Sequence, residues 1–427
     1  MSKGESNVLA SMSAPACAWR MCCGLCGDTH LTPVLELVPT PPANAFVAER
    51  ALDEVQACFP LELVLCESCR HVQLAHILDR YAMVGDAVDA DTEWPEHQAH
   101  NLAWARELME RCCAPEQSLV IDIGCNDGSL LALFEDAGWR VQGVEPSVNV
   151  AGTAIGRGID TYPGFFQPSI AARLEDERGP ARLVIAHDLM SQTDDPSGFF
   201  EGVRMLLRPD GLFSFEVPSL HALVADAGVD MITHSTLDYH SVAPLMRALN
   251  QNGLELITVT RTRLHGGRLR GMARPMGGRG PVEASVAALL ADERRLGLAE
   301  ADTYRTLASR LAAIRNQLAV YLDSAKTAGL RIAAYGAQAG ATTLLYQLGL
   351  DANVITFIAD ASPLHAGRYT PGLHIPVVAA AELEARRPDV VVVLAWQDAQ
   401  AIAAQHPDFE AAGGRFLCPF PVPTLCA

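Results

Sequence analysis

Two Cys-x-x-Cys pairs near the start of the chain have the spacing of metal ligands. Cys23 and Cys26 form the first pair, and Cys66 and Cys69 form the second. Each pair places two sulfurs on one side of a tight turn, so four thiolates can converge on one ion, and zinc is the usual occupant. Four sulfur ligands leave no open coordination position, so we predict a structural zinc site. The alternatives are four unrelated buried cysteines, or a ligand set that includes one of the nearby residues Cys17, Cys22, Cys58 and His30.

A glycine-bearing turn is the second feature with chemical meaning. Asp122, Gly124 and Gly128 form the pattern Asp-x-Gly-x-x-x-Gly, and Glu145 ends the next predicted strand. Glycine lets the backbone approach a ligand closely, and a carboxylate in that position can accept both hydroxyls of a ribose. The spacing is not the Gly-x-Gly-x-x-Gly of dinucleotide binders, which cradles a pyrophosphate. It favours S-adenosylmethionine, which has no phosphate, over a nicotinamide cofactor or a turn that binds nothing.

The remaining predicted cofactor contacts lie in the same turn and at neighbouring strand ends. Asp122 would orient the turn or meet the amino group of the methionine portion. The residues after the third predicted strand lie where adenine or methionine usually binds, although polar residues at a strand end are as often simply solvated. These further contacts are Cys125, Asn126, Pro146, His187 and Asp188.

A parallel sheet is needed to bring these residues together. Apolar strand-like runs alternate with helical segments between residues 118 and 220, which indicates a parallel α/β sheet. A helix is predicted over 99–112, another begins near Ser129, and two more lie within 281–328. A second strand–Gly–helix–strand unit follows. The predicted strands are 119–121, 141–144, 183–186, 212–217, 330–336, 354–359 and 389–394.

The predicted fold class is α/β with three domains. Residues 1–80 form an N-terminal zinc-binding domain. Residues 81–280 form a central Rossmann-like methyltransferase domain with a parallel-rich sheet that binds S-adenosylmethionine. Residues 281–427 form a C-terminal second Rossmann-like α/β domain, with leading helices, that binds substrate.

Composition narrows the class of partner and the compartment. The chain has 50 acidic and 32 basic residues and a net charge of −18, which would repel nucleic acids and anionic membranes. No apolar run approaches the roughly 18 to 20 residues of a membrane span, and no signal peptide is expected. We expect a small-molecule acceptor and a cytoplasmic protein, whose 12 cysteines stay reduced. The oligomeric state is not indicated.

Together these motifs resemble those of the zinc-containing deoxysugar C-methyltransferases, which depend on S-adenosylmethionine. The resemblance covers nearly the whole chain. It implies the three-domain fold, both cofactors, and methyl transfer to a small metabolite, with C-methylation in sugar or natural-product biosynthesis as the leading expectation. Beyond the cysteine pairs and the glycine turn, the similar segments are 59–69, 207–211, 216–218, 265–270, 335–337, 360–364, 367–369, 371–372, 374–376 and 394–396.

The chain departs from the family pattern where proton transfer is expected. Family members carry a Tyr-His-Glu-His run, whose Glu and final His handle the proton lost when a keto sugar is methylated. The matching run here is Thr-His-Ser-Thr over 233–236, and Gln192 replaces a further family histidine. Residues 82–86 replace a Tyr-x-Tyr segment, and Gly340 replaces a lysine. Either the base has moved, or the acceptor is an amine, a hydroxyl, an electron-rich ring carbon or an acidic carbon acid.

His234, Tyr239 and His240 are the candidate catalytic residues. The pKa of histidine lies near working pH, so His234 or His240 could act as a general base, although a loop histidine without a catalytic role is at least as common. If the acceptor is a nucleotide-linked sugar, its phosphates would meet arginines. Those arginines are Arg268, Arg270 and Arg368, and in the C-terminal domain Tyr335 could back a planar group and Asp360 could meet a hydroxyl.

Two other functions remain open. One is an S-adenosylmethionine-binding enzyme of altered chemistry, which performs N- or O-methylation or a non-methyl cyclisation or elimination. The other is a lapsed enzyme kept as a scaffold, but the intact Asp122, Gly124, Gly128 and Glu145 argue against it.

Overall fold

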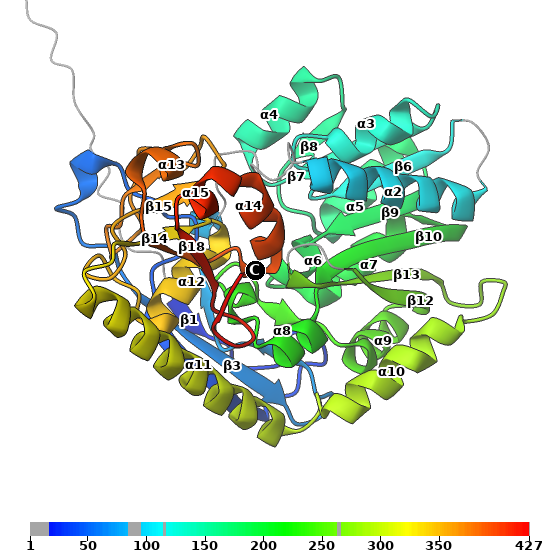
Figure 1. The fold of residues 1–427 in the computed structure, drawn as a ribbon. Coiled ribbons are helices and arrows are strands. Elements are labelled where there is room, and N and C mark those ends of the chain that lie inside the picture. The colour runs from blue at the N-terminus through cyan, green and yellow to red at the C-terminus, as the bar shows by residue number, and fades with distance from the viewer. Residues whose placement is uncertain (1–16, 84–94, 114–116, 263–265, 427) are drawn as a thin grey trace, which may run out of the picture.

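The computed structural model describes residues 17–83, 95–113, 117–262 and 266–426, and Figure 1 shows their arrangement. The described strands form sheets of two, four, seven and six strands. His265 and most of the segment 82–86 lie outside the described residues.

The N-terminal part is a small antiparallel β structure. Two strands form one sheet, and four strands in the order β11-β4-β3-β2 form the other. Leu61, Leu63 and Leu65 alternate along β3 and are buried, as the two-residue period of a strand predicts. The elements are β1 (Cys17–Trp19), β2 (Leu31–Thr40), η1 (Glu49–Ala51), β3 (Phe59–Cys66), β4 (Val72–Leu74), β5 (His76–Leu78), α1 (Arg80–Met83) and β11 (Asp238–Tyr239).

The central sheet has the strand order β12-β13-β10-β9-β6-β7-β8. The strands from β6 to β10 run parallel, which confirms the predicted parallel-rich sheet, while β13 is antiparallel to both of its neighbours. Strand order reverses between β6 and β9, and the loops after these strands lie where α/β sheets bind ligands. The strands are β6 (Leu119–Ile123), β7 (Arg140–Glu145), β8 (Thr161–Pro163), β9 (Ala181–His187), β10 (Leu207–Pro218), β12 (Leu254–Thr262) and β13 (Arg268–Pro275).

Helices cover both faces of this sheet (Figure 1). Their starts follow local rules, because the side chains of Ser147, Asp195 and Ser219 accept hydrogen bonds from backbone amides in the first turn. The helices in this part of the chain are α2 (Pro95–Cys112), α3 (Ser129–Glu135), α4 (Val148–Gly156), α5 (Pro168–Arg178), α6 (Leu189–Gln192), α7 (Pro196–Leu206), α8 (Leu220–Asp226), η3 (Val229–Met231) and α9 (Val242–Gln251). Of these, α8 and η3 pack in the core that the N-terminal sheet shares with the C-terminal unit.

The C-terminal part is a second α/β unit with the strand order β16-β15-β14-β17-β18-β19. All pairs are parallel except β18 with β19, which confirms the second Rossmann-like unit. Two helices precede it, as predicted. The elements are α10 (Ala284–Leu296), α11 (Ala301–Thr327), β14 (Ile332–Tyr335), α12 (Ala339–Leu348), β15 (Ile358–Asp360), β16 (Val377–Ala379), α13 (Glu382–Arg386), β17 (Val390–Val393), η5 (Trp396–Asp398), α14 (Ala399–Gln405), α15 (Pro407–Ala411), β18 (Arg415–Cys418) and β19 (Thr424–Leu425).

One hydrophobic core joins the N-terminal sheet to the C-terminal unit. Leu63 of β3, Leu223 of α8, Leu318 of α11 and Ile358 of β15 belong to the same cluster of buried side chains. The long helix α11 packs against β2 of the N-terminal sheet and against α12 and β14 of the C-terminal unit (Figure 1). The N-terminal sheet is therefore buried against later parts of the chain and does not stand apart as a separate module.

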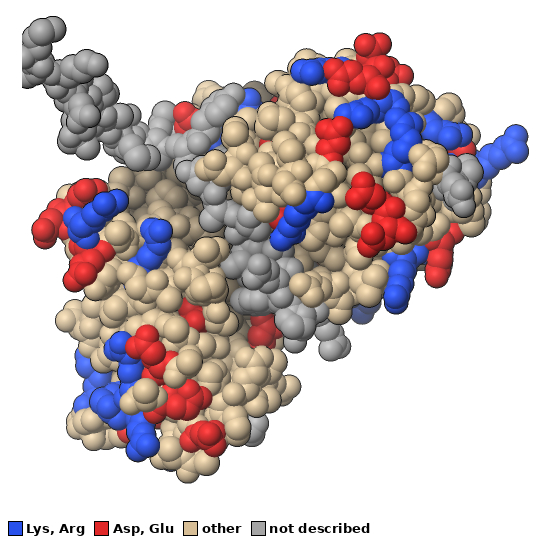
Figure 2. Space-filling view, turned by 90° about the horizontal axis from the view of Figure 1, so that it is seen from above, with Lys and Arg blue, Asp and Glu red and all other residues tan. Residues whose placement is uncertain are grey.

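Two properties of the described part bear on partners. No helix in it combines the length and apolar composition that crossing a bilayer requires. On the face shown in Figure 2, basic and acidic side chains are interspersed and do not gather into a large patch of one sign.

Candidate functional site

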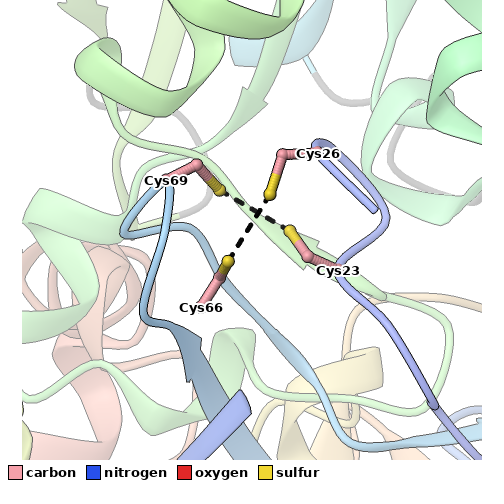
Figure 3. Close-up of side chains that lie close together, drawn as sticks. All are labelled: Cys23, Cys26, Cys66 and Cys69. Atoms are coloured by element: carbon pink, nitrogen blue, oxygen red, sulfur yellow. Dashed lines mark hydrogen bonds between the residues drawn. The ribbon is translucent and has the colours of Figure 1, made fainter. Parts of the chain in front are cut away.

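The four predicted zinc ligands converge on one point (Figure 3). Their sulfur atoms all lie within 4.8 Å of one another. The Sγ atoms of Cys23 and Cys69 are 3.6 Å apart, and those of Cys26 and Cys66 are 3.5 Å apart. The backbone closes each pair into a turn, because Gly27 N donates to Cys23 O and Arg70 N donates to Cys66 O. Cys17, Cys22 and Cys58 are exposed and do not belong to the cluster.

The chemistry of this cluster fits a dication. Burial raises the pKa of Cys26 to about 11, and the neighbouring Cys69 thiol and burial both raise the pKa of Cys23. Thiols packed this closely repel one another once ionised, and a bound Zn²⁺ removes that repulsion by taking all four as thiolates. Four sulfur ligands complete a tetrahedral shell, so zinc here supplies stability and no reactive position.

The glycine turn lies between β6 and α3 as predicted. Gly124 and Gly128 have φ angles of +85° and +79°, a region in which side chains are strained. A Cβ at Gly128 would also lie 2.9 Å from Cγ1 of Ile159. Both positions therefore require glycine, and the turn exposes its backbone to the cavity described below.

Asp122 lies near the end of β6 and is only 2% exposed. Its Oδ1 has no hydrogen-bond partner among the described residues. Burial and the nearby Glu145 charge raise the pKa of Asp122 to about 7. An orphaned buried carboxylate oxygen is costly, and a cationic ligand would satisfy it. This property fits the ammonium group of S-adenosylmethionine.

We predict that the affinity for S-adenosylmethionine falls as pH is lowered below about 7. Below that pH, the free protein holds a proton on Asp122, and a cationic ligand must displace it, which weakens binding by up to ~10-fold per pH unit. Calorimetric titration with the cofactor across this range, in buffers of different ionisation enthalpy, measures affinity and proton release together. In Asp122→Asn the affinity is lower and proton release from this group is absent. Equal proton release in both proteins would contradict the assignment.

Glu145 ends β7, and its carboxylate faces the same turn. Its Oε2 accepts from Asn126 N at 3.1 Å, and its Oε1 accepts from Ser147 N at 2.9 Å. A carboxylate oxygen can accept more than one hydrogen bond, so a carboxylate held in this position is suited to ribose hydroxyls. The two amide bonds fix the carboxylate before any ligand arrives.

The turn and Glu145 line a cavity of 840 Å³. This volume is within the usual range for small-molecule sites and is large enough for a nucleoside and a second substrate. The C-terminal unit contributes the opposite wall with the loops after β14, β15 and β17. Every predicted cofactor residue lines it, namely Asp122, Gly124, Cys125, Asn126, Glu145, Pro146, His187 and Asp188, except Gly128, which supports the turn from behind.

Asp188 is paired, which sequence reasoning missed. Both of its carboxylate oxygens accept from the Arg268 guanidinium, with Arg268 Nη2 2.8 Å from Oδ2. Arg268 begins the antiparallel strand β13, which lies beside β10. Asp188 and Arg268 are far apart in the sequence, so no local sequence pattern indicates that they pair. The pair forms one wall of the cavity and leaves less positive charge at Arg268 for a substrate phosphate.

The structure brings one of the three candidate catalytic residues to the cavity. His234 lines it, whereas Tyr239 and His240 do not, and both are only 1% exposed. Tyr239 lies in β11 within the N-terminal sheet, and the His240 ring lies 5.5 Å from that of His71. Their roles stay predictions that the geometry does not favour.

His234 has a defined tautomer. Its Nε2 lies 3.3 Å from the carbonyl oxygen of Phe59, so Nε2 carries the proton and Nδ1 is the free acceptor. Burial lowers the pKa of His234 to about 4, and the imidazole is therefore neutral at working pH. Nδ1 is buried without a hydrogen-bond partner among the described residues.

Of the other predicted substrate contacts, some line the cavity and others are buried elsewhere. Arg368 and Asp360 line the cavity, and the side chain of Arg368 is exposed. Arg270 instead pairs with Glu216 at 2.8 Å and lies 4.7 Å from the centroid of the Trp104 ring. Tyr335 is buried in the core of the C-terminal unit.

Three family models match successive parts of the chain. They describe a zinc binding domain over residues 23–83, a methyltransferase domain over 96–259 and a C-methyltransferase C-terminal domain over 263–421. The C-methyltransferase NovU of Streptomyces niveus is 32% identical over 403 residues, which cover 94% of this chain and 96% of that protein.

Two solved methyltransferase structures each overlap with less than half of the chain. Magnesium protoporphyrin IX methyltransferase ChlM of Synechocystis PCC 6803 with bound SAM is 20% identical and covers 42% of this chain and 79% of its own, with a TM-score of 0.31. The glycopeptide N-methyltransferase MtfA with (S)-adenosyl-L-methionine is 18% identical and covers 41% and 94%, with a TM-score of 0.32.

Proposed function

The chain belongs to the family of zinc-containing C-methyltransferases, and we propose that it methylates a carbon atom of a nucleotide-linked sugar or a similar natural-product precursor. It is an S-adenosylmethionine-dependent methyltransferase with a structural zinc site. The proposal that the acceptor atom is carbon is supported by the similarity to a C-methyltransferase along 94% of the chain. This similarity includes the C-terminal unit, which forms one wall of the cavity.

The residues around the turn hold the cofactor. S-adenosylmethionine, when bound, supplies an activated methyl electrophile. We assign Glu145 to the ribose hydroxyls and Asp122 to the ammonium group, because one carboxylate is already oriented by two amides and the other has an oxygen without a partner. The paired Asp188 and Arg268 keep the wall beside them polar without a large net charge. The protein's main contribution is alignment, since the electrophile is already reactive.

We assign Nδ1 of His234 to accept the proton that leaves the acceptor carbon, a role that requires this buried nitrogen to become exposed to the cavity when the acceptor binds. This residue faces the cavity, and its tautomer is set by the carbonyl of Phe59. Ser235 and Thr236, which replace the family Glu and His, cannot act as bases near neutral pH without a partner. A neutral imidazole of low pKa is a weak base, so it suits an acceptor carbon whose proton is already acidic, as it is beside a carbonyl group.

The C-terminal wall of the cavity holds the distal part of the acceptor. Arg368 is exposed there and is suited to phosphate oxygens. Oδ1 of Asp360 accepts from Ser362 N and lies 3.2 Å from Nδ1 of His365, while Oδ2 accepts from Ala337 N. The carboxylate is therefore fixed in place, and we assign Oδ2 to a hydroxyl of the acceptor. The family lysine is absent at Gly340, where a Cβ would lie 2.6 Å from the Asp230 carbonyl oxygen, so Arg368 is the cation we assign to the phosphate.

We predict that His234→Asn lowers kcat by ~100-fold or more while changing the affinity for S-adenosylhomocysteine by less than ~2-fold. Asparagine keeps the size of the side chain and removes the basic nitrogen. Steady-state kinetics and calorimetry measure the two quantities. His221→Asn, a histidine outside the cavity, is the matched control and should leave both unchanged. Unchanged turnover in His234→Asn would reject this residue as the base.

Incubation with methyl-¹³C-labelled cofactor and a panel of nucleotide-linked keto sugars tests the proposed function. We expect S-adenosylhomocysteine to form in proportion to a product in which NMR places the label on carbon. A label found on oxygen or nitrogen would show that the acceptor atom is not carbon and would overturn the proposed C-methylation. Product without S-adenosylhomocysteine would overturn methyl transfer in favour of a cyclisation or elimination.

Methylation of a hydroxyl or an amine is the second candidate. The loss of the family Glu and His at positions 235 and 236 favours it, because such acceptors need less help in losing a proton than an ordinary carbon does.

We also propose that the protein works in the cytoplasm. The four zinc ligands must remain thiolates, and reducing conditions keep them so.

A further inference from the structure

A buried polar network links the first zinc turn to the segment that carries His234. Its members are Gly24, Gln73, Arg20, Asp238 and His71, and all of the side chains are 5% exposed or less. Buried charges are costly unless they are paired, so a network of this kind calls for an explanation.

The network begins inside the zinc turn. Gly24 stands between the ligands Cys23 and Cys26, and its backbone N donates to Oε1 of Gln73 at 2.9 Å. Nη1 of Arg20 donates to the same oxygen. Space is limited, because a Cβ at Gly24 would lie 2.7 Å from Nη1 of Arg20. The conformation of the zinc turn therefore determines where the Arg20 guanidinium lies.

Asp238 is the other end of the network. Its Oδ1 accepts from Nη1 of Arg20 at 3.0 Å and from Nε2 of His71 at 2.8 Å. It also faces Gln73 directly in the antiparallel pair of β11 and β4. Strand β11 has only two residues, so its few backbone hydrogen bonds hold it weakly, and the buried ion pair supplies the specific anchor.

The anchored strand directly continues the cavity segment 233–237. Leu237 O accepts from Leu74 N of the N-terminal sheet, and Leu237 N donates to Ser191 O in the short helix α6 after β9. Nε2 of His234 donates to the Phe59 carbonyl oxygen at the start of β3. The N-terminal sheet thus holds both ends of the segment that faces the acceptor.

We propose that Asp238 is a positioning residue, through which the zinc turn, Gln73 and Arg20 fix the 233–237 segment and the Nδ1 atom of His234 against the acceptor. The zinc site then stabilises the fold and also sets the geometry of the acceptor side of the cavity. The cofactor side is built on β6 and β7 and does not depend on this network. The kinetic part of this assignment rests on the proposed function, because it requires turnover of an acceptor. The effect on the 233–237 segment can be measured without any acceptor.

Asp238→Asn tests the proposal in the zinc-loaded full chain, with three measurements made together. We expect one zinc per chain to be retained and the affinity for S-adenosylhomocysteine to change by less than ~2-fold. We expect kcat/KM for the acceptor to fall by ~10- to 100-fold, the scale of a small misplacement of a reacting group. Hydrogen exchange should become faster in residues 233–240 and stay unchanged in the strand 119–123.

Glu255→Gln is the matched control, because it removes an ion pair with Arg274 in the central sheet, away from the cavity. It should lower stability without changing the acceptor kinetics or the exchange of residues 233–240. If Asp238→Asn does not fold, Gly24→Ala gives the same test, since it keeps all four zinc ligands and displaces Arg20. Exchange and kinetics indistinguishable from those of the control would overturn the proposal. If no acceptor is turned over by the wild type, the proposed function fails, and the exchange measurement still decides this assignment.

Discussion

Cys66→Ser is expected to abolish zinc binding and to lower the free energy of unfolding by about 5 kcal/mol or more. Cys66 is fully buried, and its Sγ lies 3.5 Å from that of Cys26. A serine hydroxyl does not replace a thiolate in a four-sulfur site, and the three remaining thiols would be left crowded and unpaired. Folded domains are stable by only about 5 to 15 kcal/mol, so the N-terminal sheet should unfold. Elemental analysis and circular dichroism during heating measure both effects.

The loss should extend beyond the N-terminal sheet. Leu63 of that sheet shares a core with Leu318 of α11 and Ile358 of the C-terminal unit. Cys22→Ser is the matched control, because Cys22 adjoins a ligand but is exposed, and its effect should stay within about 0.5 kcal/mol. Full zinc content and unchanged unfolding in Cys66→Ser would show that the four cysteines are not a metal site.

Glu145→Ala is expected to weaken S-adenosylhomocysteine binding by about 100-fold or more. The substitution removes two charge-assisted hydrogen bonds to the ribose, each worth about 1.5 to 3 kcal/mol in favourable cases. It also removes the acceptor of Asn126 N and Ser147 N, so the glycine turn loses its fixed shape. Calorimetric titration measures the dissociation constant.

Two further variants separate these contributions. Glu145→Gln keeps one carbonyl oxygen and should lose less affinity than Glu145→Ala. Glu135→Ala, on the exposed face of α3, removes an equal charge at a distance from the cavity and should bind as the wild type does. Full affinity in Glu145→Ala would remove this residue from the cofactor site.

The zinc site and the cofactor turn could be predicted because the residues that form each of them lie close together in short sequence motifs. Cys-x-x-Cys fixes two sulfurs within one turn, and Asp122 with Gly124 defines a strand end and the turn after it. The zinc site also needs Cys66 and Cys69, which form a second Cys-x-x-Cys pair. The cofactor site also needs Glu145, which stands at the end of the next apolar strand. The strands β6, β7, β9, β10, β14, β15 and β17 could be predicted because each contains a short apolar run. The sequence analysis does not predict the remaining strands of the two sheets, which are β8, β12, β13, β16, β18 and β19.

The acceptor side of the cavity could not be predicted to the same degree. His234, Tyr239 and His240 are close in sequence, but β11 pairs with β4 and buries the last two among residues of the N-terminal sheet. That pairing joins strands more than a hundred residues apart, and a two-residue strand has no periodicity to reveal it.

The arginines show the same limit. Arg268 and Arg270 were both predicted to meet a phosphate, yet Asp188 pairs with the first and Glu216 with the second. Both pairs depend on the insertion of the antiparallel strand β13 beside β10, a long-range arrangement. Arg368, in a loop of the C-terminal unit, is the predicted phosphate contact that the fold leaves exposed at the cavity.

A crystal structure of the zinc-loaded chain with S-adenosylhomocysteine tests the central claim most directly. The account predicts ribose hydroxyls within hydrogen-bonding distance of the Glu145 carboxylate, the ammonium group at Oδ1 of Asp122, and a sulfur atom that faces the side of the cavity where His234 lies. Electron density for the ligand elsewhere, or against the turn but without contact to either carboxylate, would contradict it.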